Sequence, residues 1–296
     1  MALTMAEAGK LTQDMLVAGV VETVVKESVI LKYLPWMTIT GSALTYNQEA
    51  ALASAEFYTV GDTWAEGTPT FNQRTATLKI MGGDADVDNF LSRTYADPNN
   101  LEATIVAAKA KATAYSFADA FFNGDSVANP KQFDGLARLI TDASQSLSLG
   151  ANGGQLTLDK MDELLDAVKP GRPSVIFMSK RSRRKLSSLR RASGAVLETG
   201  VDQFGQHVTY YDGIPVEVDD NISDAETVGT STNASTIYAA KFGFQDGLLG
   251  IDNGRLQVER LGSLETKDAT RTRIKWYVSL VLFRQAAAAK LSGVLP

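Results

Sequence analysis

Three carboxylates at alternate positions, Asp84, Asp86 and Asp88, are the first candidates for chemistry, because closely spaced carboxylates can bind a hard cation. A calcium loop that starts at Asp84 would need glycine at its sixth position and glutamate at its twelfth. The chain has Asn89 and Tyr95 there instead. On an extended strand the three side chains share one face. We expect them to meet basic partners or water, with a metal site as the minor alternative.

A second candidate is a pair of oppositely charged runs. Residues 180–191 carry seven positive charges and no negative one, whereas residues 202–226 carry seven acidic residues and no Lys or Arg. A complementary protein contact, within or between copies of the chain, explains both runs together. A solvated face and polyanion binding are the alternatives. The resulting candidates for inter-subunit contacts are Arg183, Arg184, Lys185, Arg190, Asp219 and Asp220.

The sequence offers few candidates for catalytic residues. The chain has no cysteine, and its one histidine, His207, lies in a predicted strand without a serine nucleophile motif nearby. No glycine pattern of a nucleotide-binding loop occurs. We therefore predict no catalytic, cofactor-binding or metal-binding residues, and a protein that is not an enzyme.

The overall composition narrows the possible partners. Of 296 residues, 44% are apolar, and 34 acidic side chains outnumber 29 basic ones, for a formal charge of −5. An acidic chain is poorly suited to gripping nucleic acid over a broad surface. We find no apolar run of membrane-spanning length and no signal-peptide pattern at the start, so we expect a soluble protein made in a cytoplasm, without membrane contact.

The elements that hold these residues change along the chain. Residues 11–25 have the pattern of an amphipathic helix, and Pro35 follows. Two β-prone stretches, 56–60 and 70–81, flank a turn-rich segment and predict a long hairpin whose tip carries Trp64. An isolated hairpin is marginally stable in water, so this one should rest on another surface. Phe71 and Arg74 of this hairpin join Trp64 as candidate inter-subunit contacts.

The rest of the chain predicts a mixed α+β fold. Asp97 as N-cap, Pro98 at the first position and the stop Asn123-Gly124 delimit one long helix over residues 98–123. Further helices are expected at 158–168 and 180–189. Strands are expected at 133–141, 174–178, around 211–218, at 237–242 and at 271–283, the last of which alternates before it becomes continuously apolar.

Read in order, these features resemble the major capsid proteins of tailed bacteriophages, whose shared fold is named after phage HK97. The resemblance covers nearly the whole chain, and the ordered set of segments is more specific than any single one. Its carriers are the arm that ends in Ile30-Leu-Lys-Tyr-Leu-Pro35, the hairpin, Leu78 to Asp88, the helix ending Phe121-Phe-Asn-Gly-Asp125, Phe133-Asp-Gly-Leu136, Tyr211-Asp-Gly-Ile-Pro-Val216, Tyr238 to Gly250 and the tail Lys275 to Gly293.

The resemblance implies an α+β, HK97-like fold. Residues 1–44 would be an N-terminal arm and 45–83 an extended hairpin called the E-loop. Residues 84–140 and 256–296 would form the peripheral domain around the spine helix 98–123, although the end of the chain could return to the axial domain. Residues 141–255 would form that axial domain, which meets its copies around five- and sixfold axes.

The implied function is a structural one. The chain would self-assemble into pentamers and hexamers of an icosahedral phage head that encloses double-stranded DNA. Expected partners are copies of itself, a separate scaffolding protein, a portal and a decoration protein, and the expected location is the virion after synthesis in the host bacterial cytoplasm. The runner-up is an encapsulin-type compartment shell, and a hydrolase or sugar-binding domain is the alternative from a different class.

One departure from the family pattern gives a prediction. Some relatives cross-link an E-loop lysine to an asparagine of a neighbouring subunit. Here the E-loop offers Lys79 near its base, but residues 266–275 contain no asparagine. We therefore expect no covalent mesh between subunits. Mass spectrometry of dissociated particles should show single subunits, and a ladder of covalent multimers would contradict this.

Overall fold

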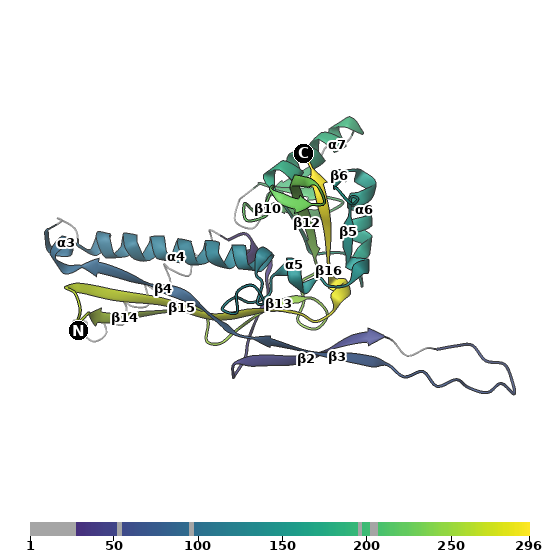
Figure 1. Ribbon diagram of the computed structural model, residues 1–296, viewed down its shortest axis with the longest axis horizontal. Helices are drawn as coiled ribbons and strands as arrows, with labels where there is room; N and C mark the ends of the chain where they lie inside the picture. The colour runs from purple at the N-terminus through teal and green to yellow at the C-terminus, as the bar shows by residue number, and fades with distance from the viewer. Residues whose placement is uncertain (1–27, 52–54, 95–97, 195–196, 202–206) are drawn as a thin grey trace, which may run out of the picture.

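The computed structural model describes residues 28–51, 55–94, 98–194, 197–201 and 207–296. Within these residues the strands form a five-stranded sheet, a nine-stranded sheet and a two-stranded hairpin. Figure 1 shows one long helix lying alongside the five-stranded sheet, the nine-stranded sheet at one end of that helix, and the hairpin extending away from both. The predicted arm helix 11–25 and the predicted N-cap Asp97 lie outside the described residues.

The five-stranded sheet is organised around its longest strand, β15. Its order is β1-β13-β15-β14, and β4 also pairs with β15 in an antiparallel register. The first half of β15 alternates buried and half-buried residues, and its last five residues are all buried. Alternation suits a half-solvated sheet, and a continuous apolar run suits a strand covered on both faces, as predicted. The strands are β1 (Trp36–Thr38), β4 (Lys79–Asp88), β13 (Leu248–Asp252), β14 (Gln257–Ser263) and β15 (Ala269–Leu282).

The nine-stranded sheet has the order β5-β16-β12-β7-β10-β9-β8, with β11 and β6 at the side of β12 and β16. Helices α6 (Leu158–Ala167) and α7 (Lys180–Ala192) bury Met161, Leu164 and Leu186 in the core of this part. The strands are β5 (Ser146–Ser148), β6 (Gly154–Gln155), β7 (Val175–Met178), β8 (Glu198–Val201), β9 (His207–Tyr211), β10 (Ile214–Val218), β11 (Glu226–Val228), β12 (Ser231–Ala240) and β16 (Ala288–Leu295).

The remaining elements are the hairpin, the long helix and several single turns. Helix α4 spans Pro98–Asn123, as predicted, and its 26 residues make it about 39 Å long. The others are hairpin strands β2 (Ala43–Ala51) and β3 (Thr70–Thr77), short helices α2 (Ile30–Tyr33), α3 (Asn89–Thr94) and α5 (Leu136–Leu139), and 3-10 turns η1 (Ala143–Gln145) and η2 (Gln285–Ala287).

An aromatic cluster at the C-terminal end of α4 joins the two sheets. Phe117 packs on Trp276 of β15, with ring centroids 5.1 Å apart. One turn further on, Phe121 and Phe122 pack on Phe177 of β7, at 5.9 and 5.5 Å. All three phenylalanines are fully buried. The same helix end therefore supplies the core of both sheets.

Two glycines allow α4 to end against the chain that follows it. A Cβ at Gly124 would lie 2.3 Å from the Phe133 carbonyl oxygen, and one at Gly135 would lie 2.5 Å from the Ala120 carbonyl oxygen. The Gly135 amide donates to the Gly124 carbonyl at 2.9 Å. Such a close approach of backbones excludes any side chain at these positions.

The structure corrects four boundaries expected from the sequence. Residues 56–60, expected as the first strand of the hairpin, lie in the connection between β2 and β3, because β2 (Ala43–Ala51) is the strand that pairs with β3. Residues 136–139 form α5 rather than part of a strand over 133–141, because Gly135 starts a helical turn packed on α4. The stretch 70–81 divides at Leu78, where the chain leaves β2 as a partner and begins to pair with β15. Residues 79–83, expected in the hairpin, therefore belong to the five-stranded sheet.

Two segments also pair with strands other than those of the domain in which the sequence placed them. Residues 248–252, expected in the axial domain, form β13 between β1 and β15 in the five-stranded sheet. Residues 288–295, grouped with residues 256–287 in the expected domains, form β16 in the nine-stranded sheet. In both cases, strand pairing with a distant segment determines the position, and local sequence carries no signal of such a partner.

The shared aromatic cluster predicts a large effect of one substitution. Phe121→Ala should lower the free energy of unfolding by about 3–5 kcal/mol, because it removes a fully buried ring between the two sheets. Urea unfolding followed by circular dichroism measures this. Ser116→Ala on the exposed face of the same helix is the control and should stay within about 0.5 kcal/mol. Equal effects of the two substitutions would contradict the role of the cluster.

Candidate functional site

The hairpin carries a structured tip on its far end. Residues 55–69 connect β2 to β3, and the rings of Tyr58 and Trp64 stack with centroids 4.5 Å apart. The Thr59 amide donates to the Asp62 carboxylate at 2.6 Å, which closes a turn. The Ala65 amide donates to the Tyr58 hydroxyl at 2.9 Å. These local contacts fix the tip although Figure 1 shows it far from both sheets.

Large apolar side chains are exposed along this hairpin. Phe57 and Val60 have relative exposures of 107% and 108%, Trp64 of 77% and Phe71 of 60%. Arg74 is also exposed, and in the strand register it lies opposite Tyr46. Exposed apolar groups gathered on one projecting element indicate a protein-contact surface. The sequence prediction named Trp64 and Phe71 but missed Phe57 and Val60, although apolar residues beside a turn were the available signal.

The base of the hairpin is held by the five-stranded sheet. The Gln48 side chain amide donates to the Leu282 carbonyl at 2.6 Å, and the Tyr46 ring packs edge-on to Phe283 at 5.3 Å. Burial raises the pKa of Tyr46, and the nearby Arg74 partly offsets this. Lys79, just beyond the hairpin, donates to the Pro130 carbonyl at 2.7 Å. The base is thus anchored while the tip has no covering surface among the described residues.

The aspartates of β4 form a charge ladder with β15. Arg273 donates two hydrogen bonds to Asp84, at 2.7 and 2.9 Å, and Arg271 donates two to Asp86, at 2.6 and 2.8 Å. Lys267 adds an ion pair to Asp86 at 2.5 Å. The basic partners expected from the sequence are therefore present, and in the described residues no group of His, Asp or Glu side chains has the arrangement of a metal site.

These contacts lower the pKa values of both carboxyl groups. Hydrogen bonds from Arg273 hold the pKa of Asp84 below its ordinary value. Hydrogen bonds from Arg271 and then Lys267 lower the pKa of Asp86 further. The third carboxylate of the motif, Asp88, instead accepts hydrogen bonds from the Phe90 and Leu91 amides at the start of α3. The sequence motif is therefore structural, with two roles that spacing alone did not separate.

Part of the basic run on α7 is neutralised within the chain. Lys180 pairs with Asp220 at 2.6 Å, and Arg181 pairs with Asp224 at 3.3 Å. Lys185 donates to Gln155. Arg183 and Arg184 are exposed and have no ion-pair partner in the described part of the chain. A complementary contact within the chain therefore accounts for some of these opposite charges.

Asp219, a candidate for an inter-subunit contact on sequence grounds, is not at the surface of the subunit. Its side chain is buried, and its carboxylate accepts hydrogen bonds from the backbone and side-chain amides of Asn221, at 2.9 and 2.7 Å. Burial raises the pKa of Asp219, which Asn221 partly counteracts. A buried carboxylate with local partners stabilises the loop after β10. We therefore withdraw Asp219 as an inter-subunit contact.

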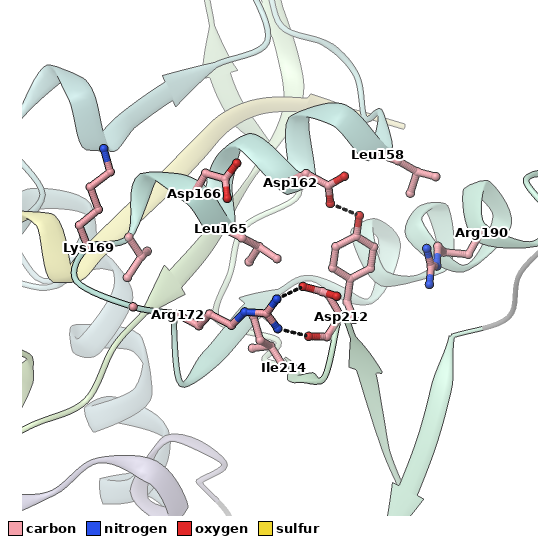
Figure 2. A pocket seen from close by; sticks show the side chains of 12 residues that line it. Leu158, Asp162, Leu165, Asp166, Lys169, Arg172, Arg190, Asp212 and Ile214 are labelled. Carbon is pink, nitrogen blue, oxygen red and sulfur yellow. Dashed lines mark hydrogen bonds and ion pairs between the residues drawn. The ribbon is translucent and has the colours of Figure 1, made fainter.

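A cavity of about 490 Å³ lies beside Arg190 of α7 (Figure 2). Its polar groups are mostly paired with one another. Arg172 pairs with Asp212 at 3.1 Å, as Figure 2 shows, and the Tyr211 hydroxyl donates to Asp162 at 2.6 Å. Arg190 lies over the Tyr211 ring, 5.3 Å from its centroid. Burial and the Asp162 hydrogen bond raise the pKa of Tyr211. His207 lies in β9, but its side chain is outside the described residues.

Comparison with known proteins agrees with this architecture. The family model described as the phage capsid family matches residues 8–293. The SrpI encapsulin from Synechococcus elongatus PCC 7942 is similar in fold, with a TM-score of 0.70 at 18% identity over 90% of this chain and 86% of that chain. The capsid of a native GTA particle gives 0.64 at 15% identity, over 90% of both chains. A chain of Microbacterium phage Oxtober96 gives 0.64 at 16% identity, over 91% of both.

The fold is therefore HK97-like, of the kind shared by phage capsids and encapsulins, as the sequence resemblance implied. The chain belongs to the phage capsid family and is a capsid shell protein, and this family implies a location in the virion. No curated protein matches the chain. Among the described helices, none is both long and apolar enough to cross a membrane.

The charge ladder predicts a specific acid sensitivity. Because the pKa values of Asp84 and Asp86 are lowered by folding, their contribution to stability is complete above an ordinary carboxyl pKa of about 4 and is lost as the pH falls through the lowered values. The free energy of unfolding of the Asp84→Asn, Asp86→Asn double variant should therefore fall less steeply below about pH 4 than that of the unmodified chain.

Urea unfolding at a series of pH values measures this slope. Asp166→Asn is the matched control, because Asp166 is an exposed carboxylate without an ion-pair partner in the described residues, and its variant should keep the original slope. An unchanged acid slope in the double variant would show that the ladder does not contribute to stability.

Proposed function

We propose that this chain is the major capsid protein of a tailed bacteriophage, which assembles into pentamers and hexamers of an icosahedral head that encloses double-stranded DNA. The observation that carries the proposal is the projecting hairpin with its uncovered aromatic side chains, in a chain of the phage capsid family. A hairpin of this kind is stable when it lies on another surface. A neighbouring copy supplies that surface in a shell.

In this proposal each part of the fold has a role in the shell. The five-stranded sheet with α4 is the peripheral domain, and the nine-stranded sheet with α6 and α7 is the axial domain, which meets its copies around five- and sixfold axes. The hairpin crosses to the next subunit. Head-to-tail contacts that use different surfaces on the two copies close into rings when the rotation between copies permits it.

The proposed partners follow from the same role. A separate scaffolding protein directs assembly, a portal occupies one vertex and a decoration protein binds the outer surface. The chain is made in the host bacterial cytoplasm, acts without catalysis or cofactors and ends in the virion. Its formal charge of −5 supports enclosure of DNA over adhesion to it, because adhesion to phosphate needs an excess of cationic side chains.

An encapsulin-type shell is the second candidate, and one observation favours it. The SrpI encapsulin has a TM-score of 0.70, above the 0.64 of the GTA capsid and of the Microbacterium phage chain. The two functions differ in their contents. Particles that package nuclease-resistant double-stranded DNA during phage growth support the capsid, and particles that retain a specific cargo protein support the encapsulin.

The hairpin residues Trp64, Phe71 and Arg74 are proposed to contact the neighbouring subunit. Trp64→Ala with Phe71→Ala should leave the unfolding free energy of the subunit nearly unchanged, because both rings are exposed. Assembly should weaken strongly, since an aromatic side chain central to an interface contributes about 2 kcal/mol, or roughly 30-fold in the association constant.

Sedimentation velocity and negative-stain microscopy, with and without a co-expressed scaffolding protein, test this prediction and the function together. The unmodified chain should form rings or closed shells. Thr63→Ala with Gln73→Ala is the control, since it changes polar neighbours and should assemble normally. Shells formed equally well by the aromatic double variant would refute the proposed contact, and an unmodified chain that forms neither rings nor shells under both conditions would refute the function.

A further inference from the structure

A basic groove of about 730 Å³ lies between α7 and the strands β9 and β10. One wall carries four cationic side chains of α7, and the facing strands contribute apolar ones. Val29, near the start of the described chain, also lines it. The wall residues are Lys180, Arg183, Arg184 and Arg191, and the apolar residues of the strands are Val208, Val216 and Val218.

The positive charge of this groove is largely uncompensated in the described residues. Lys180 is paired with Asp220, but Arg183, Arg184 and Arg191 have no ion-pair partner there. Glu217, the one acidic side chain in the lining, accepts a hydrogen bond from the Tyr33 hydroxyl at 2.6 Å. Neighbouring arginines repel one another in the absence of an anion. The groove therefore favours an occupant that is acidic and partly apolar.

The chain itself supplies such a segment in the sequence just before Val29. Residues 1–27 contain four acidic and two basic side chains, a net charge of −2 from 2 − 4. In the helix predicted for residues 11–25, Asp14 and Glu22 follow Leu11 by three and eleven positions, so they lie on the same side as Leu11 and Met15 at 3.6 residues per turn. One side of the segment thus combines apolar and acidic groups.

The start of the described chain is fixed close to the groove. Ile30 and Leu34 are buried in the core around the end of α4, and Tyr33 is tied to Glu217. The described chain begins at Ser28, directly before Val29, which lines the groove. A fifteen-residue helix is about 22 Å long, close to the roughly 20 Å of the 13-residue α7. A covalent tether also gives such a segment a high effective concentration.

We infer that the α7 groove is the docking site for residues 1–27 of the same chain, with Asp14 and Glu22 facing Arg183 and Arg184. This assignment differs from the expectation that these arginines contact a neighbouring subunit, and it does not depend on the proposed shell function. The apolar strand side chains favour a protein segment over DNA, because phosphate recognition uses cations and polar groups and gains nothing from valines.

Cysteine cross-linking tests the inference directly, because the chain contains no cysteine. Ala18→Cys in the segment is combined with Ser187→Cys in the groove, and a short bismaleimide links the two thiols. Peptide mapping and non-reducing electrophoresis then separate intrachain from interchain products. The matched control combines Ala18→Cys with Ser263→Cys, an exposed position on β14 of the other sheet. We expect an intrachain product with Ser187→Cys and little with Ser263→Cys.

Four results would overturn the inference. A dimer linked through Ser187→Cys would assign the groove to a neighbour's segment. A product with Ser263→Cys and none with Ser187→Cys would place the segment on the five-stranded sheet. Absence of both products, together with binding of a short DNA duplex that is lost in Arg183→Gln with Arg184→Gln, would assign the groove to polyanions. Absence of both products without DNA binding would leave the groove unoccupied and equally refute the docking.

Charge reversal provides a second, independent readout. In the Ala18→Cys, Ser187→Cys chain, Arg183→Glu with Arg184→Glu should slow intrachain cross-linking by about tenfold. Adding Asp14→Arg with Glu22→Arg should restore it, because the opposite charges face each other again. Circular dichroism verifies that each variant is folded. If the Arg183→Glu, Arg184→Glu chain does not fold, the neutral Arg183→Gln, Arg184→Gln chain is used in its place. Failure of the rescue would refute the proposed pairing.

Discussion

The packing of α4 against two sheets is the constraint on which the structure depends. Phe117, Phe121 and Phe122 lie in consecutive turns of one helix end, and they reach Trp276 of β15 and Phe177 of β7. A helix is stiff, so both sheets take their positions from the same short stretch of sequence. Aromatic rings bury a large apolar area and prefer specific relative orientations. This junction therefore positions the parts of the subunit as well as stabilising them.

The contact surfaces follow from what this junction leaves uncovered. The five-stranded sheet satisfies its own charges through the ladder of Asp84, Asp86, Arg271 and Arg273. The hairpin differs from the sheet because its groups are not covered within the subunit. Its tip is ordered by local contacts and exposes aromatic side chains. Polar surfaces that are internally satisfied gain little from a partner, and exposed aromatic surfaces gain much. The five-stranded sheet thus has little to gain from a partner at the ladder, and the hairpin has much to gain at its tip.

Local signals in the sequence located α4 and β15 but misassigned other segments, since residues 56–60 and 136–139 are not strands. Proline and an Asn-Gly stop delimited α4, and alternation followed by an apolar run predicted β15. Pairing between distant segments had no such signal, so the change of partner at Leu78 and the sheet to which residues 248–252 belong were not predicted. The charged candidate residues show the same limit of prediction from local sequence. Arg183 and Arg184 are exposed as expected, but the burial of Asp219 depends on a loop conformation that composition does not encode.

The pairing of β4 with β15 has a consequence for how the subunit folds. Asp86 and Arg271, partners in this pair, are 185 positions apart in the sequence. Closing so long a loop costs entropy before any contact is gained, and chains with many such contacts fold slowly. The hairpin is synthesised long before β15, the strand to which its base is anchored, leaves the ribosome. A nascent chain therefore carries exposed aromatic rings without their support, and this interval is when mispairing between chains is easiest.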